Sequence, residues 1–534
     1  MKLGAMQDFP LRIMRILDHA EREHGSREIV AARADGSIVR TDWKRLAHDA
    51  RRLGQALQRL GVRPGERVAT LAVNHDRHLT AWFGVIGMGG VLHTLNHRLF
   101  DDQLDYIVNH AEDRVLFYDA AFAPLVERMR PRWTTIKHYV CFDDGFDELL
   151  DAEDGDYRWA EGDERDPCGL CYTSGTTGNP KGVLYEHRST MLHTMSVIAP
   201  DIFDVSARSA MLPVVPMFHA GSWCIPYAAA MTGFKLVICA DNNPERLCRM
   251  FVEEGITHSA GVPTVWLSII DHVERTGADL GKLETIIVGG SSAPPATIRW
   301  FRDRGIRVNH LWGMTEMSPV GTVGAPPADW DLLSEDEQLA YMARPGRSMF
   351  GVELRVIDDD GHVLPRDGKS SGRLQTRGPG VVKRYFKEGH DSVDEDNWFD
   401  TGDIGVIHPD NSLRLTDRAK DVIKSGGEWI SSIELENAAV GCPGVAEAAA
   451  IGIPHPKWDE RPLLLVVRAN GSKIKEADIR DHLGKQIARW WQPDAIEFVE
   501  ELPHTATGKL SKKDLRDQYR DYRFANAAAV VGRD

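Results

Sequence analysis

The chain has 534 residues, enough for several domains or for one large domain with a smaller companion. Hydrophobic residues make up 42% of it and charged residues 27%, which argues against the disordered, collagen-like and low-complexity classes. The net charge of −15 gives no positive field for nucleic-acid phosphates, so we expect no nucleic-acid partner.

We expect neither a secretory signal nor an integral membrane segment. Residues 1–13 lack an apolar core behind a basic start. The longest apolar stretch, 80–92, is shorter than the roughly 18–20 residues that span a bilayer, and we interpret it as a buried helix. Seven cysteines do not make a disulfide framework, so a reducing, cytoplasmic setting is predicted.

Helical and strand-like patterns alternate along most of the chain. Residues 41–60 repeat apolar side chains every three or four positions, which predicts a helix, and Gly61 can cap its end. Short apolar runs predict buried strands at 68–73, 115–118, 138–142, 235–239, 285–288 and 308–311. This alternation favours an α/β fold with largely parallel sheets.

The pattern changes after about residue 350. Runs at 352–358 and 372–377 predict strands joined by turns, and a smaller α+β unit is expected from about residue 420. We expect helices in that unit near 433–440, 479–488 and 511–519, and strands near 446–453 and 462–467.

Cys168 and Cys171 form a Cys-x-x-Cys pair, a spacing that also serves redox and zinc chemistry. The pair lies in the apolar run that ends at Tyr172, and no second cysteine pair or His-x-His cluster accompanies it. We therefore predict buried structural cysteines.

The strongest chemical signal is a Ser/Thr/Gly-rich segment, YTSGTTGNPKGV at 172–183. Its candidate phosphate-binding residues are Thr173, Ser174, Gly175, Thr176, Thr177, Gly178 and Lys181. Glycines let backbone N–H groups approach an anion, hydroxyls donate hydrogen bonds, and lysine adds charge. Pro180 and Gly182 exclude a Walker A motif, which needs Gly and then Ser or Thr at those positions. On composition alone, a flexible surface loop explains the segment equally well.

Five motifs, in order, resemble those of the adenylate-forming superfamily, which includes acyl-CoA synthetases, luciferases and peptide-synthetase adenylation domains. The first is the phosphate segment at 172–183. The others are LWGMTE at 311–316, TGD at 401–403, DRAKDVIKSGGEWI at 417–430 and PHTATGK at 503–509. Residues 216–223, 261–266 and 424–432 are most similar to the bacterial medium- and long-chain fatty-acyl-CoA synthetases of that superfamily.

The resemblance implies a fold and a reaction. We expect a large amino-terminal domain at 1–417 with layered α/β sheets and a small β subdomain, a hinge at 418–420, and a mobile α+β domain at 421–534. The implied enzyme is an AMP-forming acid–thiol ligase. It would use ATP and Mg²⁺ to make acyl-AMP and pyrophosphate, and then transfer the acyl group to coenzyme A. The expected substrate is a medium- or long-chain fatty acid, as in fatty-acid metabolism, and the resemblance also suggests a homodimer.

Three alternatives stay open at this point. The first is a CoA ligase for an aryl acid or for 3-methylmercaptopropionate, since similar enzymes act on such acids. The second is an adenylating enzyme that loads a carrier protein. The third is a nucleotide-binding protein without catalytic activity.

The resemblance implies catalytic and metal-binding roles. Lys509 would be the catalytic residue of adenylation, because its ammonium group can bridge the substrate carboxylate and the α-phosphate. Glu316 and the Thr173 hydroxyl are the candidate Mg²⁺ ligands. His219 is expected beside the substrate carboxylate, although a lone histidine among apolar residues also suits a core position.

The resemblance also implies nucleotide and acid contacts. Trp312 should stack on adenine, Asp403 should accept hydrogen bonds from the ribose, and Arg418 should reach the ribose or the phosphates. Further nucleotide contacts are expected at Gly290, Ser291, Gly313, Met314 and Thr315. The acid pocket is expected at Phe218, Trp223, Val262 and Gly289, with Trp223 closing the acyl tunnel.

The second half-reaction requires Lys509 to leave, and the family achieves this by rotating the small domain about a hinge, here at Lys420. That rotation would present Lys424, Gly426, Gly427 and Trp429 to the thiol of coenzyme A. Two glycines without Cβ atoms suit a narrow tunnel, although a plain turn would show the same pair.

Overall fold

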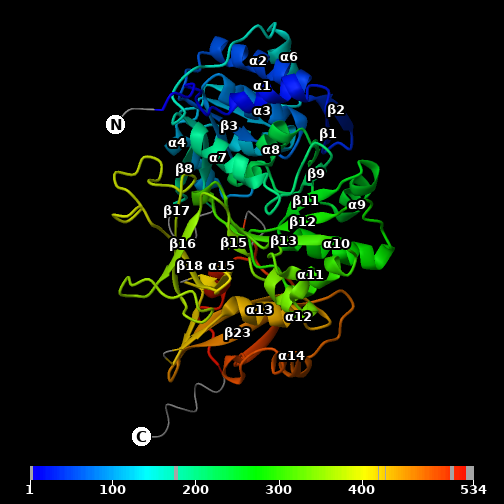
Figure 1. Ribbon diagram of the computed structural model, residues 1–534, viewed down its shortest axis with the longest axis vertical. Coiled ribbons are helices and arrows are strands. Elements are labelled where there is room, and N and C mark those ends of the chain that lie inside the picture. The colour runs from blue at the N-terminus through cyan, green and yellow to red at the C-terminus, as the bar shows by residue number, and fades with distance from the viewer. Residues whose placement is uncertain (1–3, 174–178, 419, 427, 506–509, 525–534) are drawn as a thin grey trace.

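The computed structural model describes residues 4–173, 179–418, 420–426, 428–505 and 510–524. It is a mixed α/β structure in which three sheets precede residue 419 and a fourth follows it, so the predicted α/β class is confirmed. Figure 1 shows the helix-rich layers at the top and the small carboxy-terminal unit at the bottom.

The first sheet has six strands in the order β6-β5-β3-β4-β7-β8. Its neighbouring strands are parallel except for β7 and β8, which form an antiparallel pair at one edge. The strands are β3 (Arg67–Leu71), β4 (Val91–Thr94), β5 (Val115–Tyr118), β6 (His138–Cys141), β7 (Pro167–Tyr172) and β8 (Gly182–Glu186). The accompanying helices are α2 (Trp43–Arg59), α3 (Asp76–Gly87), α4 (Asp101–Ala111), α5 (Ala123–Met129), α6 (Phe146–Asp151) and α7 (His187–Val197).

The second sheet has nine strands in the order β15-β14-β13-β12-β11-β9-β10-β1-β2. The inner strands are parallel, whereas β2, β14 and β15 pair antiparallel at the two edges. The strands are β1 (Glu28–Ala32), β2 (Ile38–Asp42), β9 (Ala210–Pro213), β10 (Lys235–Cys239), β11 (His258–Gly261), β12 (Thr285–Val288), β13 (Arg307–Gly313), β14 (Val320–Val323) and β15 (Arg347–Ser348). The accompanying helices are α1 (Met14–Glu23), α8 (Ile225–Thr232), α9 (Pro244–Glu253), α10 (Pro263–Thr276), α11 (Pro295–Arg302) and α12 (Glu335–Met342).

One buried core joins these two sheets. It contains Val68 and Phe117 of the first sheet, Ile29 and Leu236 of the second, and Phe83 of α3. The third sheet is antiparallel and consists of β16 (Glu353–Ile357), β17 (Gly372–Arg377), β18 (Phe399–Ile407) and β19 (Leu413–Arg418). Among the described residues, no helix is long and apolar enough to cross a membrane.

The carboxy-terminal unit has a five-stranded sheet with helices on both faces. Alternate residues of the central strand point to opposite faces, as strand geometry requires: Leu464 packs with Leu435 of α13, and Leu463 packs with Leu515 of α15. The elements are β20 (Ile423–Ser425), β21 (Glu428–Ile430), α13 (Ser432–Val440), β22 (Val445–His455), β23 (Asp459–Arg468), α14 (Glu476–Leu483), β24 (Ala495–Val499) and α15 (Lys512–Gln518).

Candidate active site

The phosphate segment connects two antiparallel strands. Thr173 follows β7 and Lys181 precedes β8. The Thr173 N–H donates to the Lys181 carbonyl at 2.9 Å, and the Lys181 N–H donates to Thr173 Oγ1 at 3.2 Å. A Walker A loop joins a strand to a helix instead, so the structure agrees with the exclusion of that motif.

Some predicted site residues lie outside the described residues: Ser174, Gly175, Thr176, Thr177, Gly178, Gly427 and Lys509. Only the backbone of Trp429 is described, where it pairs with Lys424 in the β20–β21 hairpin. The roles predicted for these residues therefore stay predictions.

Glu316 is a buried carboxylate in a short 3-10 turn, Thr315–Met317, after β13. Burial raises the pKa of this carboxyl group above its usual value. The Tyr385 hydroxyl donates to Glu316 Oε1 at 2.8 Å, and Lys181 Nζ lies 4.7 Å from the centre of the Tyr385 ring. Tyr385 thus brings the end of the phosphate segment and Glu316 together at one side chain.

A second tyrosine fixes the adjoining backbone. The Tyr185 hydroxyl on β8 donates to the Thr315 carbonyl at 2.7 Å. The Met314 N–H donates to the Pro319 carbonyl at 2.9 Å, and a Cβ on Gly313 would lie only 1.9 Å from that oxygen. Sequence reasoning missed both tyrosines, because a single tyrosine outside a recognised motif carries no local signal.

Three strands bring the adenine and ribose motifs together. Trp312 Nε1 on β13 donates to Asp403 Oδ2 on β18 at 2.8 Å, and Arg418 Nε on β19 lies 3.4 Å from Asp403 Oδ1. Asp403 and Arg418 are direct partners in the β18–β19 register. The Trp312 ring is itself buried, and its stacking on adenine stays a prediction.

The predicted nucleotide contacts Gly290 and Ser291 lie in a Gly-Gly-Ser-Ser segment, residues 289–292, that follows β12. Gly290 has φ of +89°, a left-handed conformation that favours glycine. Ser291 is exposed, and Ser292 Oγ accepts a hydrogen bond from Asn437 Nδ2 of α13 at 3.1 Å. This segment therefore contacts the carboxy-terminal unit directly.

The acid-pocket candidates surround a left-handed turn, η2 (Ala220–Cys224), in which each φ is positive, from 42° to 61°. Such a backbone is costly for residues that carry a Cβ, and strain of this kind gathers at functional sites. The turn places the buried Trp223 ring next to Gly289, which directly follows β12. A Cβ on Gly289 would lie 3.0 Å from Trp223 Cη2 and 2.4 Å from Leu311 Cδ1. Gly289 leaves the space that these two side chains fill.

The other acid-pocket candidates flank this turn in the sequence or the fold. His219 directly precedes the turn and is half-buried. Phe218 is buried, and the centre of its ring lies 5.0 Å from the centre of the His97 ring in an edge-to-face arrangement. Val262 is half-buried and caps the amino-terminal end of α10.

A small cavity of about 30 Å³ adjoins the turn, roughly the share of one water molecule in the liquid. Its wall includes Trp82, Leu92, Cys168, Cys171, Cys224 and Tyr227. Cys168 and Cys171 are free and buried, and burial raises the pKa values of their thiols to about 12 and about 11. The prediction of structural cysteines is therefore confirmed.

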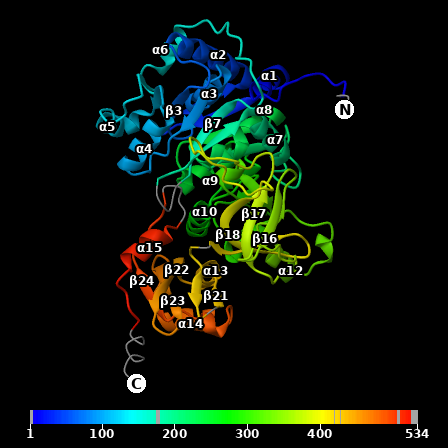
Figure 2. The ribbon, with the colours of Figure 1, turned by 90° about the vertical axis from the view of Figure 1, so that its left-hand side faces the viewer.

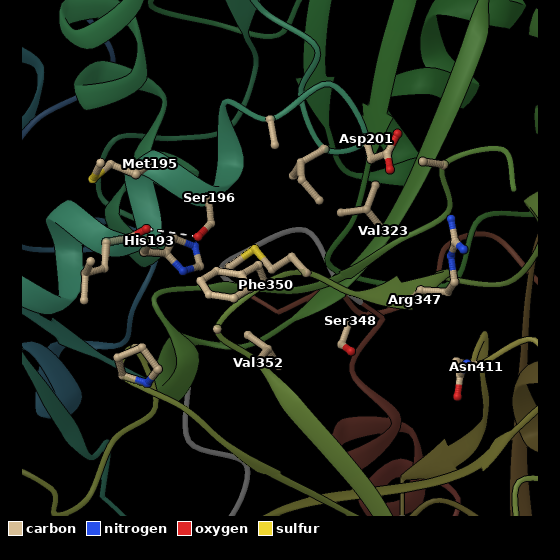
Figure 3. A pocket seen from close by; sticks show the side chains of 18 of the residues that line it. His193, Met195, Ser196, Asp201, Val323, Arg347, Ser348, Phe350, Val352 and Asn411 are labelled. Carbon is tan, nitrogen blue, oxygen red and sulfur yellow. Dashed lines mark hydrogen bonds between the residues drawn. The ribbon is translucent and has the colours of Figure 1, made fainter. Parts of the chain in front are cut away.

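A separate groove of about 850 Å³ opens between α7 and residues 347–352. Figure 3 shows Met195, Ser196 and Phe350 around it. His193 in its wall accepts a hydrogen bond at Nε2 from the Val320 N–H at 3.2 Å, and burial lowers the pKa of this histidine to about 3. None of the predicted site residues lines this groove, so cavity size does not by itself identify the site.

The predicted thiol-facing residues belong to the hairpin of β20 and β21. Lys424 and Gly426 are both exposed. The Lys424 N–H donates to Glu460 Oε2 at 2.9 Å, and the Gly426 N–H donates to the Trp458 carbonyl at 2.8 Å. Lys420 is exposed in the turn after β19.

The order of the motifs and the convergence of the adenine and ribose motifs place this fold in the class of adenylate-forming enzymes. Family comparison gives the same result. The model of the AMP-binding enzyme family matches residues 17–386, and that of the AMP-binding enzyme C-terminal domain matches residues 434–509. The chain belongs to the AMP-binding enzyme family.

Similar proteins are ligases of different acids. The chain is 46% identical to 3-methylmercaptopropionyl-CoA ligase of Ruegeria lacuscaerulensis, over 97% of this chain and 99% of that protein. It is 42% identical to medium-chain-fatty-acid–CoA ligase of Ectopseudomonas oleovorans, over 99% and 100%. The fold is similar to that of an anthranilate CoA ligase solved with anthranoyl-AMP, with TM-score 0.87, 24% identity and coverage of 98% and 100%.

Proposed function

We propose that this chain activates a short apolar carboxylic acid and transfers it to coenzyme A. As a member of its family it is an AMP-forming acid–thiol ligase that uses ATP and coenzyme A. A carboxylate oxygen attacks the α-phosphorus of ATP and pyrophosphate leaves. The thiol sulfur then attacks the acyl carbon, AMP leaves with the oxygen it gained, and the thiol proton passes to solvent. The observation that carries the proposal is that Tyr385 contacts both Glu316 and Lys181, which belong to two different motifs of the family.

Adenylation brings anions together, so its main requirement is positive charge in the right place. We assign that role to Lys509, with Lys181 on the phosphate side. Asp403 and Arg418 are placed to hold the ribose, because a carboxylate accepts hydrogen bonds from hydroxyls and its pairing with Trp312 fixes its orientation.

The donor set beside the phosphate segment fits Mg²⁺. Glu316 offers a carboxylate oxygen and Thr173 a hydroxyl oxygen, and Mg²⁺ prefers hard oxygen ligands while keeping waters and substrate phosphates. When bound, the ion would neutralise charge on the phosphates. Glu316 is buried, and a bound cation would compensate the charge of this carboxylate.

For thioester formation we propose that the carboxy-terminal domain, residues 421–534, rotates about Lys420. The exposed positions of Lys424 and Gly426 support this, since they leave that hairpin free to approach the large domain. Gly427 and Trp429 would accompany them.

We place a short acid before the expected medium- or long-chain fatty acid because the chain is 46% identical to a 3-methylmercaptopropionyl-CoA ligase and because Trp223 occupies space in the expected acid pocket. Trp223 fills the space beside Gly289 in the expected acid pocket. A short apolar acid such as 3-methylmercaptopropionate would require a smaller movement of Trp223 than a longer acid would. A fatty acid of eight or more carbons would require the Trp223 side chain to move away from Gly289. Such an acid is the second candidate, because the chain is 42% identical to a medium-chain-fatty-acid–CoA ligase.

A panel of acids tests this proposal. Purified enzyme with ATP, Mg²⁺ and coenzyme A is assayed for AMP release with 3-methylmercaptopropionate, butanoate, octanoate, palmitate and benzoate. We expect release to require both acid and coenzyme A, with the highest kcat/KM for a short acid. Equal release with a carrier protein in place of coenzyme A would favour the carrier-loading alternative, and no release with any acid would contradict the proposal.

Cytoplasmic location and a homodimer are further proposals. All seven cysteines are free, which suits a reducing compartment. The mass of the particle in solution, measured by light scattering, would decide between monomer and dimer.

A further inference from the structure

A largely buried lysine lies next to the segment that contains Lys509 but has no part in the reaction described above. Lys512 is the first residue of α15, three positions after Lys509. Its Nζ lies 2.8 Å from Glu436 Oε1 of α13 and donates a hydrogen bond to Ser432 Oγ. The Lys512 side chain is 10% exposed and that of Glu436 is 15% exposed. A lysine is rarely buried unless a partner compensates its charge.

Ser432 carries this contact across the predicted hinge. Its backbone N–H and its hydroxyl donate to Asp417 Oδ2 at 2.7 Å and 2.5 Å. Asp417 is buried on β19, before the hinge at 418–420, whereas Ser432 and Lys512 follow the hinge. The chain of contacts Lys512–Ser432–Asp417 therefore joins the two sides of the hinge.

A second ion pair strengthens this arrangement. Arg516 NH1, one turn further along α15, lies 2.5 Å from Asp421 Oδ1, directly after the hinge. Burial would lower the pKa of Lys512, but the carboxylates of Glu436 and Asp417 hold it above its usual value, so the lysine stays charged. Removing the charge of Lys512 would leave the buried carboxylate of Asp417 and the largely buried carboxylate of Glu436 without their cation, which is costly.

The residues on either side of the segment that contains Lys509 are bonded to each other. The Ser511 N–H donates to the Pro503 carbonyl at 2.8 Å, and His504 and Leu510 form an antiparallel bridge. Ser511 in turn directly precedes Lys512. The contacts that hold Lys512 in place therefore also hold the carboxyl-terminal end of this segment in place.

The described arrangement presents α15, and not the β20–β21 hairpin, to the large sheets. Figures 1 and 2 both place α15 at the end of the carboxy-terminal unit nearest the rest of the molecule. Lys424 and Gly426 of the hairpin are exposed instead. Under the proposed function, this is the arrangement that serves adenylation.

We propose that Lys512 is a positioning residue that holds the adenylation arrangement, by tying the segment bearing Lys509 to Asp417 across the hinge through Ser432. It touches neither substrate nor nucleotide. The inference rests on the proposed function, because it concerns the first of the two half-reactions.

The test separates the half-reactions in Lys512→Met. Adenylation is measured as acid-dependent exchange of pyrophosphate into ATP, with 3-methylmercaptopropionate and with octanoate. Thioester formation is measured from the synthetic acyl-adenylates and coenzyme A. We expect exchange to fall by about 10²-fold while thioester formation changes by less than about threefold, since misplacement at a distance costs about that much. Lys512→Arg should restore most of the exchange.

Lys513→Met is the matched control, because Lys513 is the neighbouring lysine on α15 and is exposed. It should match the wild type in both half-reactions. If Lys512→Met does not fold, Ser432→Ala decides, since it removes the hydroxyl through which Lys512 reaches Asp417 and keeps both the Lys512–Glu436 pair and the backbone N–H bond to Asp417. Equal loss in both half-reactions of a folded variant, or unchanged exchange, would overturn the inference. Absence of exchange in the wild type and in Lys513→Met would instead contradict the proposed function.

Discussion

At the scale of single residues, the motifs predict the groups that would face the nucleotide but not the groups that hold those side chains in place. Glu316, Asp403 and Trp312 belong to recognisable motifs. In the structure Trp312 donates a hydrogen bond to Asp403, and Glu316 lies in the short turn that follows the strand of Trp312. Tyr385 and Lys512 escaped sequence analysis. Their partners lie 69 and 80 residues away, and such contacts depend on tertiary packing that no local pattern encodes.

Tyr385 offers a test at this scale. Tyr385→Phe removes the hydroxyl that donates to Glu316 Oε1 and leaves a buried carboxylate oxygen without its partner. An unsatisfied buried group of this kind costs about 1–3 kcal/mol, so we expect kcat/KM for pyrophosphate exchange to fall about tenfold or more.

The control is Tyr139→Phe on β6, at the edge of the first sheet opposite β8. It should leave exchange unchanged. Wild-type exchange in a folded Tyr385→Phe would show that this hydrogen bond does not support the reaction.

At the scale of secondary structure, buried strands were predicted best. The runs at 115–118, 235–239 and 285–288 coincide with β5, β10 and β12, because parallel strands covered on both faces consist of continuous apolar residues. Edge and polar strands were missed. β2 exposes alternate residues and shows no apolar run, and β11 contains His258 and Ser259, which neighbouring strands bury.

Several predicted boundaries differ from those of the structure, and two of the differences have a clear physical reason. The helix predicted at 41–60 begins at Trp43, because residues 41 and 42 complete β2 and the Asp42 side chain caps the helix by accepting from the Arg45 N–H. The helix predicted over 80–92 ends at Gly87, and residues 91 and 92 belong to β4. Apolar content alone does not distinguish a buried helix from the buried strand that follows it.

The left-handed turn η2 gives a prediction about acid selection. Trp223→Ala removes the ring that fills the space beside Gly289 and should admit longer tails. We expect the ratio of kcat/KM for octanoate to that for 3-methylmercaptopropionate to rise about tenfold or more, because each buried methylene contributes to binding. A ratio equal to that of the wild type across the acid panel would remove Trp223 from acid selection.

Helix α7 gives a prediction about pH. His187 Nδ1 accepts a hydrogen bond from the Ile13 N–H, and His193 Nε2 accepts one from the Val320 N–H. Burial lowers the pKa of each to about 3, whereas an unfolded histidine titrates near 6.5. Between those pH values the unfolded chain binds more protons, so the free energy of unfolding falls as the pH falls.

His193→Gln tests this contribution, since glutamine keeps an acceptor but does not titrate. Urea unfolding between pH 7 and pH 5 should show a pH slope lower than that of the wild type by up to about 1.4 kcal/mol per pH unit. His362→Gln, at an exposed position, should keep the wild-type slope. An unchanged slope in His193→Gln would mean that this histidine is not neutral in the folded protein.

At the scale of the whole molecule, the adenine and ribose motifs converge where the second and third sheets meet, and the carboxy-terminal unit lies against this region. β13 supplies Trp312, β18 and β19 supply Asp403 and Arg418, and Asn437 of the small unit reaches Ser292 of the large one. The family resemblance implied that both motifs contact one nucleotide, which requires them to lie close together. The resemblance could not predict which face of the small unit points inward, because that depends on torsion angles at a few residues of the predicted hinge.

The central claim is that an ammonium group of the small unit serves one half-reaction and must withdraw for the other. Lys509→Ala tests this most directly, with pyrophosphate exchange and thioester formation from supplied acyl-adenylate measured on the same preparation. We predict that exchange falls by about 10²–10³-fold or more while thioester formation is retained. Equal loss of the two half-reactions, or exchange at the wild-type rate, would contradict the account.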